Sequence, residues 1–267
     1  YWRDEHSENG KYKPHLLLLQ GFRSASCDWQ LLWPDLAQQF RRQVFDFLGF
    51  GLSQKPYAHR YTLIEQADIA QEYLREEGIT DCYLLAHDYG VSIAQELLCR
   101  QDQYDFTIQQ CAFLNGGLFA DQHRPLLMQR LLKSILGPMI VPLLSKRSLH
   151  QNFTKIFGPD TPPSAQLIHD LWELLKVNGG TKVIPALLQY IDERMVYATK
   201  WREAMPLQQQ KLAFINGVHD PISGKNMLEA FATCCPEAET KSLNVGHYPQ
   251  LEDANAVYSA LKEIWRL

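Results

Sequence analysis

The sequence has no apolar run long enough to cross a membrane. The nearest candidate, residues 126–144, is interrupted by Gln129, Arg130 and Lys133, whereas a membrane-spanning helix needs about 20 mostly apolar residues in a row. The start of the chain also lacks a signal-peptide pattern, because charged residues crowd its first eight positions. The chain begins at Tyr1 rather than at methionine, which leaves room for a targeting segment ahead of it.

An excess of basic charge is absent as well. The 26 Lys and Arg stand against 30 Asp and Glu, which gives a net charge of −4, and proteins that bind nucleic acid usually carry a basic patch or stripe. Hydrophobic residues make up 46% of the 267 residues, enough for a sizeable core. We therefore expect a globular protein that binds no nucleic acid and takes a small, apolar to moderately polar substrate.

Motifs for metals, nucleotides and disulfide frameworks are also missing. The histidines show no H-E-x-x-H motif or paired-ligand spacing, and residues 49–51 lack the third glycine of a dinucleotide fingerprint. The six cysteines have no C-x-x-C spacing, which is typical of reduced thiols in a reducing compartment. The sequence predicts a cytoplasmic protein that uses no metal and no cofactor, and it leaves the oligomeric state open.

Strand and helix patterns alternate along much of the chain. Short apolar runs predict strands at residues 15–19, 43–47, 82–86, 111–114, 212–215 and 240–243. Helical spacing predicts helices at residues 61–76, 91–99 and 255–265. Strands that alternate with helices pair in parallel, so the sequence predicts an α/β fold.

Between residues 122 and 201 the pattern is helical, without a convincing strand. Helical periods cover residues 126–135, 164–177 and 181–201, with prolines between them. We therefore predict an α/β core formed by residues 1–116 and 208–267, into which a helical cap of residues 117–207 is inserted.

One strand-to-helix junction, residues 84–90 (LLAHDYG), carries chemistry. Two small residues, Ala86 and Gly90, bracket Asp88 where the predicted strand ends. This is the small-x-nucleophile-x-small pattern of a nucleophile elbow, whose tight turn lifts the central side chain above the sheet. The plainer interpretation is that Asp88 caps the following helix by accepting backbone N–H bonds.

Two later segments favour the nucleophile. Asp220 lies in the turn after a predicted strand, and His247 lies in a loop before the last helix. Alone, Asp220 would be a turn residue and His247 an ordinary loop histidine. Together with Asp88 they follow the chain order nucleophile, acid, histidine of the α/β-hydrolase triad, each at the end of the expected element. The sequence therefore predicts this catalytic triad.

The chain resembles the α/β-hydrolases of the haloalkane dehalogenase and epoxide hydrolase branch, and within that branch the mesoderm-specific transcript-like proteins. The stretches that carry the resemblance span nearly the whole chain: residues 21–22, 28–29, 46–56, 87–90, 123–127, 157–159, 187–191 and 247–253. The resemblance implies the α/β-hydrolase fold, with a mostly parallel sheet flanked by helices and an inserted helical cap.

An aspartate nucleophile favours particular substrates. A carboxyl with a reference pKa of about 3.9 is already ionised at neutral pH. Its attack on a saturated, electrophilic carbon gives an ordinary ester, whereas attack on a carbonyl would give an unstable anhydride. His247 would then activate a water that attacks the Asp88 ester, with Asp220 orienting the imidazole. By position, the backbone N–H groups of Phe22 and Tyr89 would form the oxyanion hole.

The chain departs from the resembled branch at residues that bear on the leaving group. Dehalogenases of the branch cradle the halide with a Trp after the nucleophile and with an Asn or second Trp, but here these positions are Tyr89 and Phe22. Epoxide hydrolases use two cap tyrosines, and Tyr190 falls where one would stand, although a packing role fits it equally well. No tyrosine between residues 104 and 190 supplies the second.

The strand-end motif of the branch is altered too, since Gln20 replaces its His and Arg23 its Pro. These changes could shift the oxyanion loop and place a positive charge at the mouth of the site. We expect epoxide hydrolysis through an alkyl-enzyme ester, with haloalkane hydrolysis as the alternative. A non-catalytic ligand-binding protein of the same fold is the alternative of another class, and the complete triad argues against it.

Overall fold

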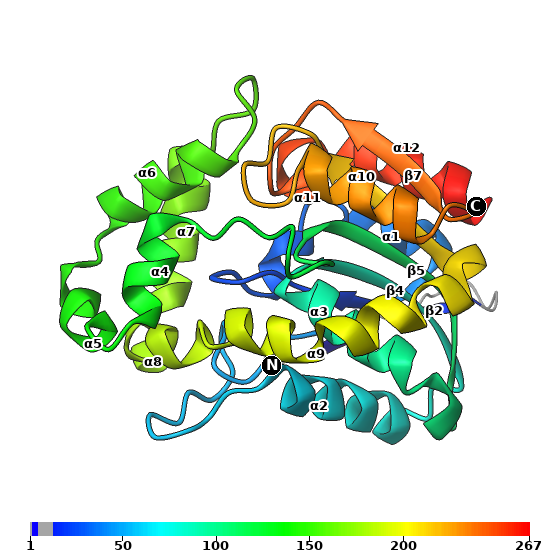
Figure 1. Cartoon of the computed structure of the whole chain (residues 1–267), viewed down its shortest axis with the longest axis horizontal. Helices are drawn as coiled ribbons and strands as arrows, with labels where there is room; N and C mark the ends of the chain where they lie inside the picture. Colours follow the sequence, from blue (N-terminus) through cyan, green and yellow to red (C-terminus); the bar gives the residue numbers. More distant parts are fainter. Residues whose placement is uncertain (1, 5–12) are drawn as a thin grey trace.

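The computed structural model describes residues 2–4 and 13–267. Glu5 and Glu8, two of the charged residues on which the absence of a signal-peptide pattern rests, lie outside the described residues. Within the described residues one seven-stranded sheet has the order β1-β3-β2-β4-β5-β6-β7 (Figure 1). Six strands run parallel, and β1 pairs antiparallel with β3 at one edge. The strands are β1 (Trp2–Asp4), β2 (His15–Leu19), β3 (Arg41–Phe45), β4 (Asp81–Asp88), β5 (Thr107–Gly116), β6 (Leu212–Gly217) and β7 (Glu239–Leu243).

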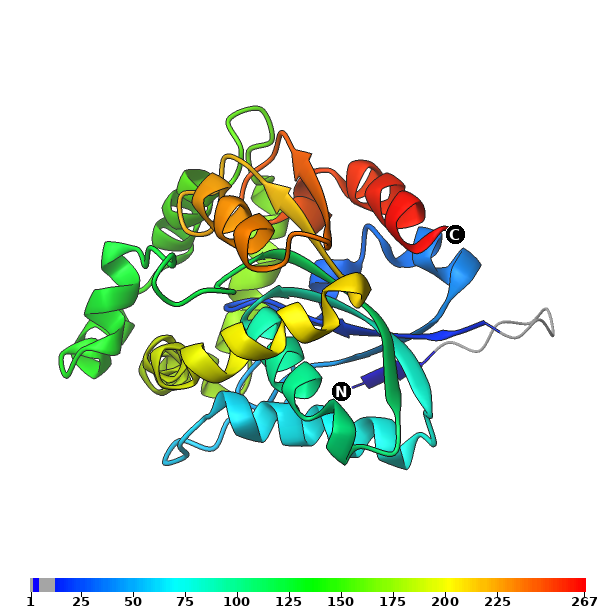
Figure 2. The same cartoon turned by 45° about the vertical axis from the view of Figure 1, so that its right-hand side comes forward.

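Helices cover both faces of the sheet, which explains why its central strands are apolar throughout. In β2, Leu17 and Leu19 pack in one buried cluster and Leu16 and Leu18 in the other, because successive strand residues point to opposite faces. The first cluster includes residues of α2 (Leu63–Glu76), α3 (Tyr89–Cys99) and α10 (Lys225–Cys234). The second includes residues of α1 (Trp33–Gln39) and α12 (Ala254–Trp265) (Figure 2).

Most helices of the proposed cap extend to one side of the sheet, at the left of Figure 1, and the last of them runs back across the core. They are α4 (Leu127–Lys133), α5 (Gly137–Ile140), α6 (Lys146–Ile156), α7 (Ala165–Lys176), α8 (Gly180–Leu187) and α9 (Tyr190–Ala204). Of these, α9 returns to the core and contacts α3. We keep residues 117–207 as the proposed extent of the cap. None of the helices that the structure describes combines the length and the hydropathy of a bilayer span.

Short helical turns complete the chain. They are α11 (Pro249–Glu252), η1 (Ser26–Trp29), η2 (Gln101–Gln103), η3 (Val141–Leu143), η4 (Val177–Gly179) and η5 (Pro206–Lys211). Among the elements predicted from the sequence, β1, α1, α5, α6, α10 and α11 have no counterpart.

The predicted strand at 43–47 is displaced, because β3 begins at Arg41 and ends at Phe45. At its beginning the Arg41 N–H donates to Pro14 O. Beyond Phe45 the Gln20 side chain takes the place of a neighbouring strand. In the amide orientation that satisfies both its oxygen and its nitrogen, Gln20 donates to Phe45 O at 2.9 Å and accepts from Phe47 N–H at 3.1 Å. Because β3 begins with two arginines, a prediction based on apolar residues places the start of the strand too late.

The single helix predicted at 181–201 is two helices, α8 and α9. At the end of α8 the Gln189 side-chain amide, rather than its backbone N–H, donates to Pro185 O at 3.1 Å. The Gln189 N–H instead donates to Ala186 O at 3.3 Å. This tightening of the last turn separates the helices and sets the direction in which α9 runs back over the core.

Candidate active site

Asp88 lies at the end of β4 and directly before α3 in a strained backbone conformation. Its φ is 42° and its ψ is −97°, a conformation that non-glycine residues adopt only where the surroundings enforce it. Gly90 permits the turn, because a Cβ there would lie 2.3 Å from Leu19 O. The alternative of a helix cap is wrong, since the Asp88 side chain makes no capping hydrogen bond to α3.

The structure brings the three predicted triad residues together. His247 Nδ1 lies 2.7 Å from Asp220 Oδ2, and His247 Nε2 lies 3.9 Å from Asp88 Oδ2. All three side chains are buried. Asp220 follows β6, and His247 comes after β7 and before α11, so the ends of three strands supply the three groups.

Asp220 is fixed by several donors besides His247. Ser223 Oγ donates to its Oδ2 at 2.6 Å, and the Ile222 N–H donates to its Oδ1 at 2.7 Å. From the end of β5, Asn115 Nδ2 also donates to Oδ2 at 3.0 Å. Sequence reasoning missed Asn115, whose place at the end of a predicted strand was the available signal.

Two further contacts hold the loops that carry the site. His87 Nε2 donates to the backbone carbonyl of His247 at 2.8 Å, and Tyr248 Oη donates to Phe22 O at 3.1 Å. The first contact fixes the histidine loop against β4. The second fixes the loop after β2, which carries one of the predicted oxyanion donors.

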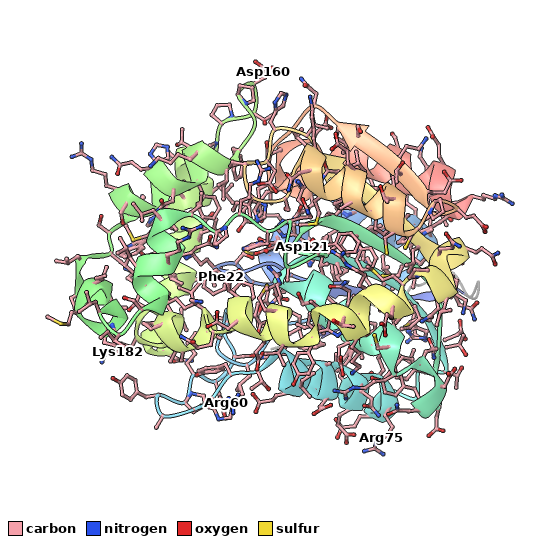
Figure 3. All side chains as sticks on the ribbon, viewed as in Figure 1. Phe22, Arg60, Arg75, Asp121, Asp160 and Lys182 are labelled. Atoms are coloured by element: carbon pink, nitrogen blue, oxygen red, sulfur yellow. The ribbon has the colours of Figure 1, made fainter. Side chains whose placement is uncertain are left out.

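The loop after β2 brings the Phe22 N–H to the Asp88 carboxylate, with its nitrogen 3.1 Å from Oδ2. Gln20 and Arg23 therefore do not move this donor away from Asp88. Tyr89 is the first residue of α3, and the first N–H groups of a helix have no partner within the helix. Both predicted oxyanion-hole residues thus flank Asp88. Figure 3 shows Phe22 between the core and the helices of the proposed cap.

The charges of the site are strongly coupled. Burial opposes ionisation of Asp88, but the hydrogen bond and charge of His247, with Arg194, hold the pKa of Asp88 well below its usual value. Burial likewise opposes the charged form of His247, but Asp220 and Asp88 outweigh it and raise the pKa of His247 to about 10. At neutral pH the site therefore holds an imidazolium between two carboxylates.

Arg194 is a site residue that sequence reasoning missed. It is buried, and its Nη2 donates to the backbone carbonyl of Asp88 at 2.7 Å and lies 3.6 Å from Asp88 Oδ1. Its Nε donates to Ser92 Oγ at 2.7 Å. Arg194 follows Tyr190 by four residues in α9, so the two share one helix face, and this spacing was the available signal.

Tyr190 and His123 present polar atoms without partners. The Tyr190 hydroxyl and both His123 ring nitrogens are buried and make no hydrogen bond among the described residues. The Tyr190 ring lies 5.5 Å from Phe22 and 4.5 Å from the Arg194 guanidinium carbon. Burial raises the pKa of Tyr190 above its usual value and lowers the pKa of His123 to about 3. Both groups are therefore neutral.

His123 was given no role from the sequence, although it begins one of the stretches that carry the family resemblance. The charges that act on it include those of Arg194, Asp88, His247 and Asp220, which places it at the site. In the described part of the chain, no group of three or more His, Cys, Asp or Glu side chains could hold a metal ion.

Comparisons with known proteins agree with this architecture. A family model described as alpha/beta hydrolase fold matches residues 14–254. The mesoderm-specific transcript protein of Mus musculus is 39% identical over 249 residues, covering 89% of this chain and 74% of that protein. A putative hydrolase, LipZ of Mycobacterium tuberculosis, is 36% identical over 250 residues, covering 92% of this chain and 86% of that protein.

Solved structures share the fold. Haloalkane dehalogenase DbeA from Bradyrhizobium elkani matches with a TM-score of 0.82 at 19% identity, over 99% of this chain and 93% of that chain. The predicted α/β fold and the resemblance are thereby confirmed.

Proposed function

The chain belongs to the α/β-hydrolase family and is a hydrolase, and we propose that it works through an alkyl ester of Asp88, with epoxides as its preferred substrates. The observation that carries the proposal is an ionised Asp88 beside a Phe22 donor and a His247–Asp220 pair. An ionised carboxylate needs no base to become a nucleophile.

In the first step Asp88 Oδ1 attacks a ring carbon of the epoxide. The C–O bond of the ring breaks, and the ring oxygen takes a proton from the Tyr190 hydroxyl. Oδ2 keeps its hydrogen bond with the Phe22 N–H. The unpartnered Tyr190 hydroxyl supports this role, because a buried donor without an acceptor is available to a substrate oxygen. Its raised pKa keeps it protonated until the ring opens.

Before the second step the Tyr190 phenolate takes the proton of the resting His247 imidazolium. A water then attacks the carbonyl carbon of the Asp88 ester and gives a proton to His247. Negative charge then develops on the oxygen that Phe22 and Tyr89 face. The intermediate collapses, the departing alcohol oxygen takes the proton from His247, and the proton left on the new Asp88 carboxyl passes to His247 and restores the imidazolium. The sum is epoxide plus water giving a diol.

Haloalkane hydrolysis is the second candidate, and Arg194 supports it. Its Nη1 is buried and makes no hydrogen bond within the described part of the chain. Its guanidinium lies beside Asp88 Oδ1, where a cation could stabilise a departing halide. This arrangement would replace the indole N–H groups that are missing at Phe22 and Tyr89. An epoxide needs a proton donor as well, and Tyr190 is the group that supplies it.

The test is covalent trapping in His247→Gln, which keeps the nucleophile and loses the proposed base. After incubation with terminal epoxides and 1-bromoalkanes, we expect intact mass to show one adduct, on the peptide that carries Asp88. An epoxide adds its full mass, whereas a bromoalkane adds its alkyl group and loses bromide. Asp88→Ala is the matched control and should give no adduct.

Three outcomes would contradict the proposal. An adduct on another residue would mean that the roles are misassigned. Asp88→Ala turning over substrate at more than a few per cent of the parent rate would exclude the ester. Saturable, reversible binding without any adduct would identify a non-catalytic binding protein.

A further inference from the structure

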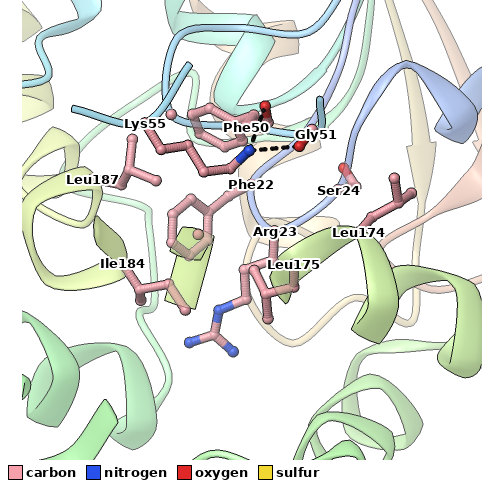
Figure 4. Close-up of a pocket in the computed structure, with 12 residues that line it drawn as sticks. Phe22, Arg23, Ser24, Phe50, Gly51, Lys55, Leu174, Leu175, Ile184 and Leu187 are labelled. Atoms are coloured by element: carbon pink, nitrogen blue, oxygen red, sulfur yellow. Dashed lines mark hydrogen bonds between the residues drawn. The ribbon is translucent and has the colours of Figure 1, made fainter. Parts of the chain in front are cut away.

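A narrow cavity lies between the loop after β2 and the helices α7 and α8 (Figure 4). Phe22 lines it, and the Phe22 N–H donates to Asp88 Oδ2. Its free volume is about 20 Å³. Most of its wall is apolar and comes from Phe22, Phe50, Leu174, Leu175, Ile184 and Leu187. Such a wall suits a hydrocarbon chain rather than a strongly hydrated group.

Two cations, Lys55 and Arg23, line this cavity. The Lys55 ammonium is already satisfied by the backbone, because it donates to the carbonyls of Phe50, Gly51 and Ser53 at 3.3, 2.5 and 3.1 Å. Its three donors are therefore used within its own loop, and it has none to offer a ligand.

Arg23 is in the opposite situation. Its Nε and Nη2 are buried and have no hydrogen-bond partner among the described residues. The side chain runs from the loop toward the cap helices, between Ile184 and Leu175 (Figure 4). A φ of 68° at Arg23 itself is strained for a non-glycine residue.

The unpartnered atoms form a specific edge of the guanidinium. The N–H groups of Nε and Nη2 point in the same direction, which is the side-on geometry in which Arg binds both oxygens of a carboxylate. A guanidinium does not deprotonate in proteins, and a buried charge without a partner is costly. The charge of Asp88 acts on Arg23, but no side chain in the described structure accepts a hydrogen bond from this edge. An anion bound there would remove the remaining cost.

We propose that Arg23 binds the carboxylate of the substrate, so that this hydrolase acts on electrophilic carboxylic acids with an apolar chain. The electrophilic carbon meets Asp88, the chain lies against the leucines of α7 and α8, and the carboxylate pairs with Arg23. The inference rests on the proposed function of Asp88 and adds the substrate class.

The test compares two probes that differ in charge only. In the His247→Gln background, ω-bromoalkanoates and the primary amides of the same acids are compared by the rate at which each alkylates Asp88, over a series of chain lengths. At the best length we expect the acid to react on the order of 10- to 100-fold faster than its amide, the range for a lost charge-assisted bidentate pair.

Variants assign this preference to Arg23. Arg23→Gln should bring the acid down to the rate of the amide and leave the amide within about threefold of its parent rate. Arg23→Lys keeps the positive charge but lacks the pair of parallel N–H donors, so it should retain part of the preference for the acid over the amide. Lys182→Gln is the matched control, because it removes a cation from an exposed position of the cap (Figure 3), and the preference should stay.

The failure of this inference is distinct from that of the proposed function. If the amide alkylates Asp88 and the acid reacts no faster, or if Arg23→Gln keeps the preference, the carboxylate site is refuted and the covalent mechanism stands. If neither probe alkylates Asp88, the mechanism fails and calorimetry with octanoate and octanamide decides the anion site. Octanoate binding that disappears in Arg23→Gln supports the site, and equal binding of both ligands refutes it.

Discussion

Tyr190→Phe separates a catalytic tyrosine from a packing tyrosine by two measurements. The Tyr190 side chain is fully buried, and its hydroxyl makes no hydrogen bond to any residue that the structure describes. A buried polar group without a hydrogen bond destabilises the folded state by about 1–3 kcal/mol. Removing the hydroxyl while keeping the ring should therefore raise the free energy of unfolding by about 1 kcal/mol, which corresponds to about 2–4 °C in Tm for a domain of this size.

Tyr248→Phe is the matched control. Tyr248 is also buried beside Phe22, but its hydroxyl donates to Phe22 O at 3.1 Å. Its removal leaves a buried carbonyl without that donor, so the free energy of unfolding should fall by about 1 kcal/mol. The two Tyr→Phe changes remove the same atom from the same site and should shift Tm in opposite directions.

The kinetic measurement follows alkylation of Asp88 in the His247→Gln background. Tyr190→Phe should slow alkylation by an epoxide on the order of 10²-fold or more, because the ring oxygen loses its proton donor. Alkylation by a bromoalkane should change little, since bromide leaves without a proton. The reasoning is refuted if Tyr190→Phe lowers Tm as Tyr248→Phe does, or if epoxide alkylation stays within about twofold of the parent.

Three further predictions concern the frame of the site. Gly90→Ala should lower the free energy of unfolding by about 3 kcal/mol in urea titrations, because the new Cβ would lie 2.3 Å from Leu19 O; an unchanged unfolding midpoint would contradict the elbow geometry. Because folding raises the pKa of His247 to about 10, the protonated imidazole adds to the free energy of unfolding. This contribution is complete below about pH 6.5 and is lost as the pH rises through about 10. Urea titrations should show a fall of at most about 1.4 kcal/mol per pH unit for this group, and His247→Gln should lack it; parallel curves would mean that the imidazolium is not stabilised. Asp220→Asn removes the group that raises the pKa of His247 most, so hydrolysis of the Asp88 ester should slow on the order of 10²-fold or more and the adduct should accumulate in intact-mass spectra; turnover at the parent rate would exclude the assigned role of Asp220.

The parts of the site that could be predicted from the sequence are those with local patterns. Asp88 lies between small residues at a strand-to-helix junction, and Asp220 and His247 follow predicted strands. Each pattern depends on a few neighbouring residues, because an elbow or a strand-end turn is determined by local sterics. Chain order then connected the three without any knowledge of distances.

Arg194 and Arg23 could not be assigned in this way. Arg194 reaches the backbone of Asp88 across 106 residues of sequence, and helical periodicity predicts the face of a helix but not what that face meets. For Arg23 the sequence showed a departure from the family and a charge near the mouth of the site. The absence of any partner for its Nε–Nη2 edge depends on α7 and α8, whose position only the folded chain defines.

The protonated state of His247 explains why an aspartate suits this site. A serine nucleophile would need a neutral histidine at once, whereas a resting imidazolium between Asp88 and Asp220 cannot take a proton. An ionised Asp88 attacks without that help, and the first step of the proposed mechanism converts its negative charge into a neutral ester. One of the two carboxylates that raise the pKa of His247 is then gone, so the pKa of His247 falls. The imidazolium proton is therefore easier to remove once the ester that His247 must help to hydrolyse has formed.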